Sequence, residues 1–198
     1  MGLPVGELVI ATNINDILHR TMETGRYEVL GVAATQSPSM DIQVSSNFER
    51  LLFEACGKDA DHLSTLMAGL KQSGSFTLSS EMRDYIAAGF ASGRTSEAET
   101  ADIIRTTWTD TGELLDPHTA VGYGVARARA RREAPMVTLA TAHPAKFPDA
   151  VAAASHVRPA LPDRLGDLMQ RKERFDVLAN DLAIVKQFIL ERTKVGKS

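Results

Sequence analysis

The stretch that decides the fold class is residues 7–13, ELVIATN, in which an apolar run ends on a polar residue just before a helix signal. The run contains β-branched residues and does not alternate with polar ones, which is typical of a strand that is covered on both faces. Asn15 or Asp16 can cap the helix that follows, and Gly25 can end it. We therefore expect a strand, a short turn and a helix, a unit typical of α/β proteins.

A second apolar run, residues 135–141 (PMVTLAT), predicts another buried strand, which His143 and Pro144 interrupt before a further helix. Weaker signals predict short strands at residues 75–78 and 174–178. So few strands do not complete a sheet by themselves, and open strand edges invite pairing with other strands. The sequence therefore favours a helix-rich α/β fold that forms part of a larger sheet. A small α+β domain with further, unrecognised strands is the alternative interpretation.

Helix signals occupy most of the remaining chain. Ser96 and Glu99 have the spacing of a capping box, in which each side chain bonds the other residue's backbone. Asp116 followed by Pro117 predicts the start of another helix. In the last predicted helix, which Asn180 caps, we expect one buried apolar stripe; it contains Leu182, Val185, Phe188 and Ile189. The predicted helices cover residues 16–23, 47–55, 59–72, 80–90, 96–108, 116–132, 147–155 and 181–193, and residues 32–40 are predicted to be a loop.

The composition argues against several classes of function. Of the 198 residues 43% are hydrophobic and 24% charged, and no segment approaches the roughly 18 apolar residues of a membrane helix. The net charge is −3 and both signs are interspersed, so the chain has no positive field that would hold nucleic acid or an anionic membrane surface. Cys56 is the only cysteine, so the chain cannot form an internal disulfide. Asp116 and His118 alone offer too few ligands for a metal site, so none is expected.

Five segments of the chain resemble, in the same order, segments of threonine synthases. They are GELVIATNINDILHR (6–20), SPSMDIQVSSNFERLLFEA (37–55), LLDPHTAVGYG (114–124), ATAHPAKFPDAV (140–151) and ERFDVLANDLAIVKQFI (173–189). Together they span nearly the whole chain. The resemblance identifies residues 1–198 as the carboxy-terminal portion of such an enzyme, comprising part of the cofactor-binding catalytic domain and the carboxy-terminal helices.

The resemblance implies a fold-type-II enzyme that uses pyridoxal 5'-phosphate and works in the cytoplasm. The complete enzyme would convert O-phospho-L-homoserine and water to L-threonine and phosphate. In this family the lysine that binds the cofactor lies in the amino-terminal half, which is therefore the expected partner, and the present chain alone would be inactive. One alternative is a noncatalytic module that pairs with a separate amino-terminal half. Another is a related lyase such as threonine dehydratase, against which the SSNFERLL and DPHTAVG motifs weigh.

The resemblance also assigns roles to individual residues. It places Thr141, at the end of the predicted second strand, opposite the pyridine nitrogen of the cofactor, and His143 close to the cofactor or substrate. A hydroxyl can donate a hydrogen bond to a neutral ring nitrogen, so Thr141 predicts a largely unprotonated ring. Polar residues after the first strand and near the start of the second helix are candidates for binding the substrate. They are Asn13, Asn15, Asp16, Ser45, Ser46, Asn47 and Arg50.

Overall fold

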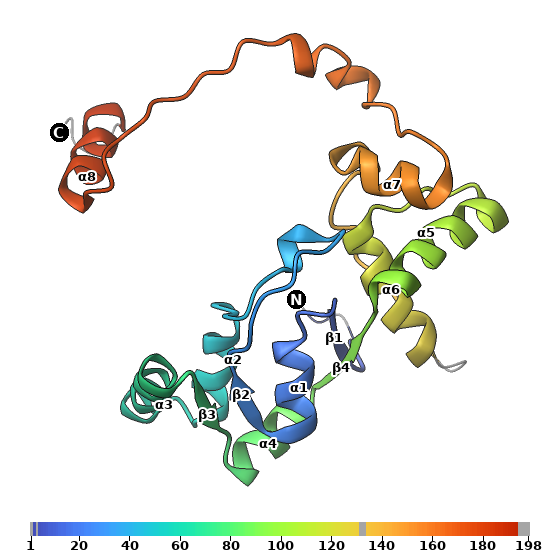
Figure 1. Cartoon of the computed structure of the whole chain (residues 1–198). Helices are drawn as coiled ribbons and strands as arrows, with labels where there is room; N and C mark the ends of the chain where they lie inside the picture. Colours follow the sequence, from blue (N-terminus) through green and yellow to red (C-terminus); the bar gives the residue numbers. More distant parts are fainter. Residues whose placement is uncertain (1, 3, 131–133, 194–198) are drawn as a thin grey trace. The chain divides into compact units, whose positions relative to one another are not determined.

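The computed structural model describes residues 2, 4–130 and 134–193. The chain divides into two compact units, Met1–Ala160 and Leu161–Ser198, which Figure 1 shows with the colours of the sequence. The fold is α/β and rich in helix, as predicted. In the first unit, the helices are α1 (Ile17–Thr24), α2 (Phe48–Ala55), α3 (Ala60–Ser73), α4 (Ser80–Ala87), α5 (Glu97–Thr111), α6 (Pro117–Arg129) and α7 (Pro148–Ser155).

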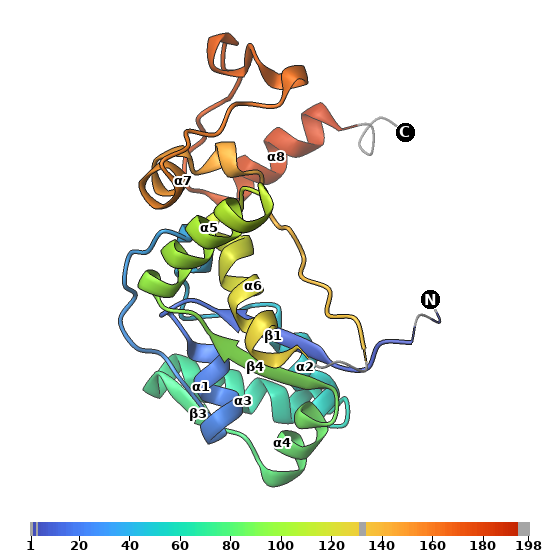
Figure 2. The ribbon, with the colours of Figure 1, turned by 90° about the vertical axis from the view of Figure 1, so that its right-hand side faces the viewer.

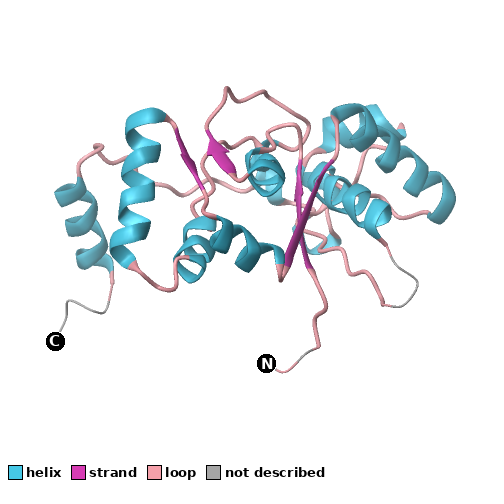
Figure 3. Cartoon of the chain, turned by 90° about the horizontal axis from the view of Figure 1, so that it is seen from below, coloured by secondary structure: helices cyan, strands magenta, loops and turns pink. Residues whose placement is uncertain are grey.

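The strands form two separate pairs, which Figure 3 distinguishes from the helices by colour. Strand β1 (Leu8–Thr12) runs parallel to β4 (Phe90–Arg94), with Thr12 opposite Arg94. Strand β2 (Arg26–Glu28) is antiparallel to β3 (Ser75–Thr77). The predictions of β1 and β3 are confirmed, whereas β2 and β4 were not predicted.

Helices cover both faces of the β1–β4 pair. Ser92 of β4 lies against α1, where its hydroxyl is 2.9 Å from Nδ1 of His19. The next residue, Gly93, lies against α6, because a Cβ at this position would be only 2.6 Å from Cγ1 of Val125. Successive strand residues point to opposite faces, so α1 and α6 pack on opposite sides of the pair, as Figure 2 also shows. The expectation of a strand covered on both faces is confirmed.

Local signals placed most helix ends correctly. Gly25 ends α1 with φ of 77°, the left-handed conformation that glycine adopts readily. Both hydrogen bonds of the predicted capping box of α5 are present between Ser96 and Glu99. Helix α6 starts at Pro117 and ends at Arg129, because Ala130 has a non-helical backbone conformation. The last two residues of its predicted range, 131 and 132, lie outside the described residues.

Two hydrophobic clusters hold the first unit together. In the larger one, the ring of Tyr27 stacks between Phe76 and Phe48, with centroid distances of 4.9 and 5.7 Å. Leu52 of α2 is 1% exposed in the same cluster. The smaller cluster joins α5, α6 and α7 through Ile104, Ala120 and Ala154. The larger cluster reaches Phe90, where β4 begins, and the smaller one joins three helices that follow β4.

The predicted strands at residues 135–141 and 174–178 are wrong. Both segments are irregular in the structure, and their apolar side chains are exposed, for example Val137 (77%) and Val177 (85%). A strand requires a partner for its backbone hydrogen bonds, and the described residues provide none for either segment. Apolar and β-branched composition alone therefore misled the prediction.

The second unit contains two short 3-10 turns, η3 (Asp163–Leu165) and η4 (Leu168–Gln170), and helix α8 (Leu182–Arg192). Its helix was predicted, but the cap is Asp181, whose carboxylate accepts from the N–H groups of Ala183 and Ile184, rather than Asn180. Within this unit the expected stripe is not fully buried: Leu182 is 71% and Ile189 51% exposed, whereas Val185 and Phe188 are half-buried. The unit is too short to cover its own helix.

Candidate functional site

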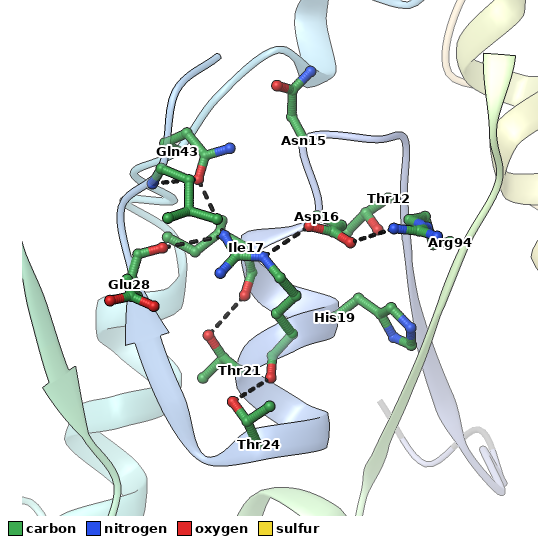
Figure 4. A network of polar contacts seen from close by, with 12 residues as sticks. Thr12, Asn15, Asp16, Ile17, His19, Thr21, Thr24, Glu28, Gln43 and Arg94 are labelled. Atoms are coloured by element: carbon green, nitrogen blue, oxygen red, sulfur yellow. Dashed lines mark hydrogen bonds and ion pairs between the residues drawn. The ribbon is translucent and has the colours of Figure 1, made fainter. Parts of the chain in front are cut away.

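Polar residues gather where the parallel strands β1 and β4 end, the edge at which α/β proteins usually bind ligands. Asn13, Asn15 and Asp16 follow β1 directly, and all three are buried. Figure 4 shows Asp16 and Asn15 at the turn between β1 and α1, with Arg94 of β4 beside them. Three of the residues predicted to bind substrate are therefore brought together.

Asn13 and Asn15 hold the loop that follows β2. Nδ2 of Asn13 donates to Oδ1 of Asp41 at 2.8 Å, and Nδ2 of Asn15 donates to the same oxygen at 2.9 Å. The hydroxyl and the N–H of Thr35 also donate to Asp41, at 2.6 and 2.9 Å. Asn15 additionally exchanges two hydrogen bonds of 2.9 Å with the backbone of Ala33. The two amides thus use most of their capacity within the protein, which fixes residues 33–41 beside the strand ends.

Asp41 is the charged centre of this network. Burial would raise the pKa of its carboxyl, but the bonds from Thr35, Asn13 and Asn15 outweigh burial and hold this pKa below its ordinary value. The group is therefore a stable carboxylate at neutral pH. Its role is to hold the loop, because several donors of the protein already occupy it.

Asp16 joins α1 to the end of β4 through two arginines. Its Oδ1 accepts from Nε of Arg20 at 2.8 Å. Its Oδ2 accepts from Nη1 of Arg94 at 3.0 Å, a contact that Figure 4 shows. Nη2 of Arg20 reaches the carbonyl of Glu28 at 3.1 Å. The side chain of Arg94 remains 54% exposed. A cation held in place yet open to solvent at the strand ends can bind an anionic group.

A second buried network surrounds the start of α6. Asp116 caps this helix, accepting from the N–H groups of His118 and Thr119 at 2.9 and 3.3 Å. Nδ1 of His118 lies 2.9 Å from Oδ1 of Asp116, and the hydroxyl of Thr119 donates to Oδ2. The N–H of Ser39 donates to Nε2 of His118 at 3.1 Å. The sequence predicted that a helix starts at Asp116 and Pro117, which is confirmed, but it did not reveal the hydrogen bonds that join Asp116 to His118 and Thr119.

Thr141 lies next to the start of α6. Its N–H donates to the hydroxyl of Thr119 at 3.2 Å, which fixes its backbone. The residue is exposed, and its own hydroxyl forms no hydrogen bond to any residue that the structure describes. Nδ1 of His143 accepts from the N–H of Ala145 at 3.1 Å, so this ring caps the turn Pro144–Lys146. Thr141 thus offers a free hydroxyl, whereas one nitrogen of His143 already has a partner.

The group around the start of α2 is separate from both networks. The N–H of Ser45 donates to the hydroxyl of Tyr27 at 2.9 Å. Nη2 of Arg50 donates to Oδ1 of Asn47 at 2.8 Å, and these two residues and Ser46 are exposed. Across the described part of the chain, no hydrogen bond joins this group to Asn13, Asn15 or Asp41.

The described ranges are residues 2, 4–130 and 134–193. They contain no group of three or more His, Cys, Asp or Glu residues placed to hold a metal ion. Nor do they contain a helix that is long and apolar enough to cross a membrane.

Comparisons with known proteins agree on one family. A family model described as "Threonine synthase, C-terminal" matches residues 119–189. The threonine synthase of Pseudomonas aeruginosa is 46% identical over 199 residues, covering 100% of this chain and 42% of that protein. The crystal structure of threonine synthase from Brucella melitensis with bound PLP is 60% identical and superposes with a TM-score of 0.86 over 96% of this chain and 41% of its own. Yeast threonine synthase gives 34% identity and a TM-score of 0.80 over 100% of this chain and 44% of its own. The chain spans less than half the length of these relatives.

Proposed function

Because this chain belongs to the threonine synthase family, we propose that it supplies the carboxy-terminal part of an enzyme that converts O-phospho-L-homoserine and water to L-threonine and phosphate. The relatives named above support this proposal, since all are threonine synthases. They give no support to the alternative of a threonine dehydratase. The enzyme would be a lyase of amino-acid biosynthesis, with a cytoplasmic location.

The cofactor of this proposal is pyridoxal 5'-phosphate, which the Brucella melitensis relative binds. When bound, it supplies an electron sink for reactions at the carbon atoms of an amino acid. The observation that carries the proposal is the free hydroxyl of Thr141, whose backbone is fixed by Thr119 at 3.2 Å. A single neutral donor on a fixed backbone fits the pyridine nitrogen, because the hydroxyl can donate to this nitrogen without favouring its protonation.

The strand-end residues would form the substrate side of the site. The side chain of Arg94, held by Asp16 at 3.0 Å and half-exposed, is suited to the carboxylate or the phosphate of the substrate. Asn13 and Asn15 would act by holding the loop of residues 33–41 against the site. Arg50, with Asn47, Ser45 and Ser46, remains a second candidate for contact with the substrate.

The lysine that moves protons in such a reaction would come from the amino-terminal portion. Two lysines, Lys146 and Lys186, lie within segments that resemble the family. Lys146 follows the predicted second strand, and its Nζ lies 5.7 Å from the centroid of the Phe147 ring. Its place after the predicted second strand does not correspond to the family's cofactor lysine. We therefore propose that the present chain binds and orients the cofactor and the substrate, while the amino-terminal portion supplies the general acid and base.

A chimaera tests the proposed function directly. The chain would be joined to the amino-terminal portion of the Brucella melitensis enzyme, of which it covers 41%, and incubated with pyridoxal phosphate and O-phospho-L-homoserine. We expect phosphate and threonine to appear in equal amounts. The intact Brucella melitensis enzyme serves as the positive control. A folded, cofactor-loaded chimaera that releases neither product would refute the proposal and favour a noncatalytic module.

A further inference from the structure

We propose that Asp116 is a positioning residue that holds two loops of the candidate site in place, one through His118 and the other through Thr119. The first loop contains Ser39, and the second contains Thr141. The positioning itself follows from hydrogen bonds in this chain, whereas its consequence for catalysis rests on the function proposed above.

The connection through His118 has only one possible direction. The backbone N–H of Ser39 can only donate, so Nε2 of His118, 3.1 Å away, must accept. The hydrogen of the neutral ring is therefore on Nδ1, which donates to Oδ1 of Asp116 at 2.9 Å. The ring of Phe147, with its centroid 4.5 Å away, packs against the imidazole. The carboxylate thus fixes both the tautomer and the orientation of the ring that holds Ser39.

The connection through Thr119 is directed in the same way. A hydroxyl has one hydrogen, and that of Thr119 points to Oδ2 of Asp116. A lone pair of the same oxygen then accepts the N–H of Thr141 at 3.2 Å. Without the carboxylate the hydroxyl could rotate, and the acceptor for Thr141 would no longer be fixed.

Asp116 is placed to serve both connections at once. Its side chain is fully buried and that of His118 is 7% exposed, so water does not compete for these bonds. It receives four donors: two backbone N–H groups of α6, the imidazole and the hydroxyl. The helix N-terminus compensates the buried charge. In an Asp116→Asn variant, an NH2 group would replace one of the two carboxylate oxygens. This group would then face a donor of the protein and could not accept its hydrogen bond.

The two loops belong to opposite parts of the site. Ser39 lies between Ser37 and Asp41, both of which bind Asn13 after β1. Thr141 is the proposed partner of the cofactor ring. One buried carboxylate therefore sets the position of the substrate side and of the cofactor side together.

Amide hydrogen exchange, measured by NMR on the full chain, tests this inference without cofactor or substrate. We expect Thr119→Val to accelerate exchange at Thr141 alone and His118→Phe to accelerate it at Ser39 alone, by about tenfold, the change expected for one lost hydrogen bond. Asp116→Asn should accelerate exchange at both amides. Thr119→Ser keeps the hydroxyl, so exchange at Thr141 should be as slow as in the unaltered chain. Asp59→Asn is the matched control, because Asp59 caps α3 in the same way but contacts neither loop.

The result that would overturn the inference is equally specific. If Thr119→Val and His118→Phe each accelerate both amides alike, or neither, the two separate connections do not exist. Amides of α3 report whether a variant has lost its overall fold, and the two milder variants keep the test decisive if Asp116→Asn does not fold. A chimaera that releases no phosphate would count against the proposed function and leave this result unaffected.

Discussion

The close contact between β4 and α6 predicts a large and specific effect of one added methyl group. Gly93→Ala would place a Cβ 2.6 Å from Cγ1 and 3.1 Å from Cγ2 of Val125, which is 4% exposed. Overpacking of this kind costs about 1–3 kcal/mol of the free energy of unfolding. Gly89→Ala is the matched control, because its Cβ would have no atom within 4 Å. That variant should be neutral or should stabilise by about 0.4–1 kcal/mol through the unfolded chain.

A double-mutant cycle separates the clash from other effects. Val125→Ala removes both Cγ atoms and destabilises by itself, yet it provides room for the methyl of Gly93→Ala. We therefore expect Gly93→Ala to cost almost nothing in the Val125→Ala background, a coupling of about 1–3 kcal/mol. Urea unfolding can be followed by the fluorescence of Trp108, the single tryptophan, which lies in α5 next to α6. An equal cost of Gly93→Ala in both backgrounds, or a cost no larger than that of Gly89→Ala, would refute this packing.

Three further predictions concern the candidate site and its supports. The pKa of Asp41 is lowered in the folded chain, so this carboxylate stabilises the fold above its unfolded pKa of about 3.9 and ceases to do so as pH falls through the folded value. Asp41→Asn should therefore reduce the loss of stability at acid pH, measured by urea unfolding at several pH values. An unchanged loss would contradict the network around Asp41. Tyr27→Phe removes the acceptor for the N–H of Ser45, 2.9 Å away, and should cost about 1 kcal/mol in the same assay; a cost near zero would show that water replaces the hydroxyl. In the chimaera, Thr141→Val should weaken pyridoxal phosphate binding by about tenfold through loss of one hydrogen bond, whereas Thr141→Ser should not. If equilibrium dialysis gives the two variants equal affinities for pyridoxal phosphate, Thr141 does not belong to the site.

Sequence reasoning succeeded where the signal is local. The helix stop at Gly25 and the capping box of Ser96 and Glu99 depend on residues within one turn, and both are present. Strand β1 was recognised from its apolar run, whose central residues are half-buried between helices. Its partner β4 was missed because Ser92 and Gly93 have little preference for strands, and Gly93 is small to accommodate α6.

The errors concern interactions between distant parts of the chain. Residues 135–141 have the composition of a strand, but among the described residues no neighbour pairs with them. The contact between Ser39 and His118 joins residues 79 positions apart, which no spacing rule reveals. The role of Thr141 as a cofactor partner came from the family resemblance and stays a prediction. What the structure adds is a free hydroxyl on a fixed backbone.

The most direct test of the central claim is the intact mass and the visible absorbance of the native protein isolated from its source. If this chain is the carboxy-terminal part of a threonine synthase, it should be found with a lysine-bearing amino-terminal portion, in one polypeptide or as a partner, and the preparation should show the visible band of bound pyridoxal phosphate. A colourless protein of 21.4 kDa that copurifies with no such portion, and that stays colourless when pyridoxal phosphate is added, would contradict the claim.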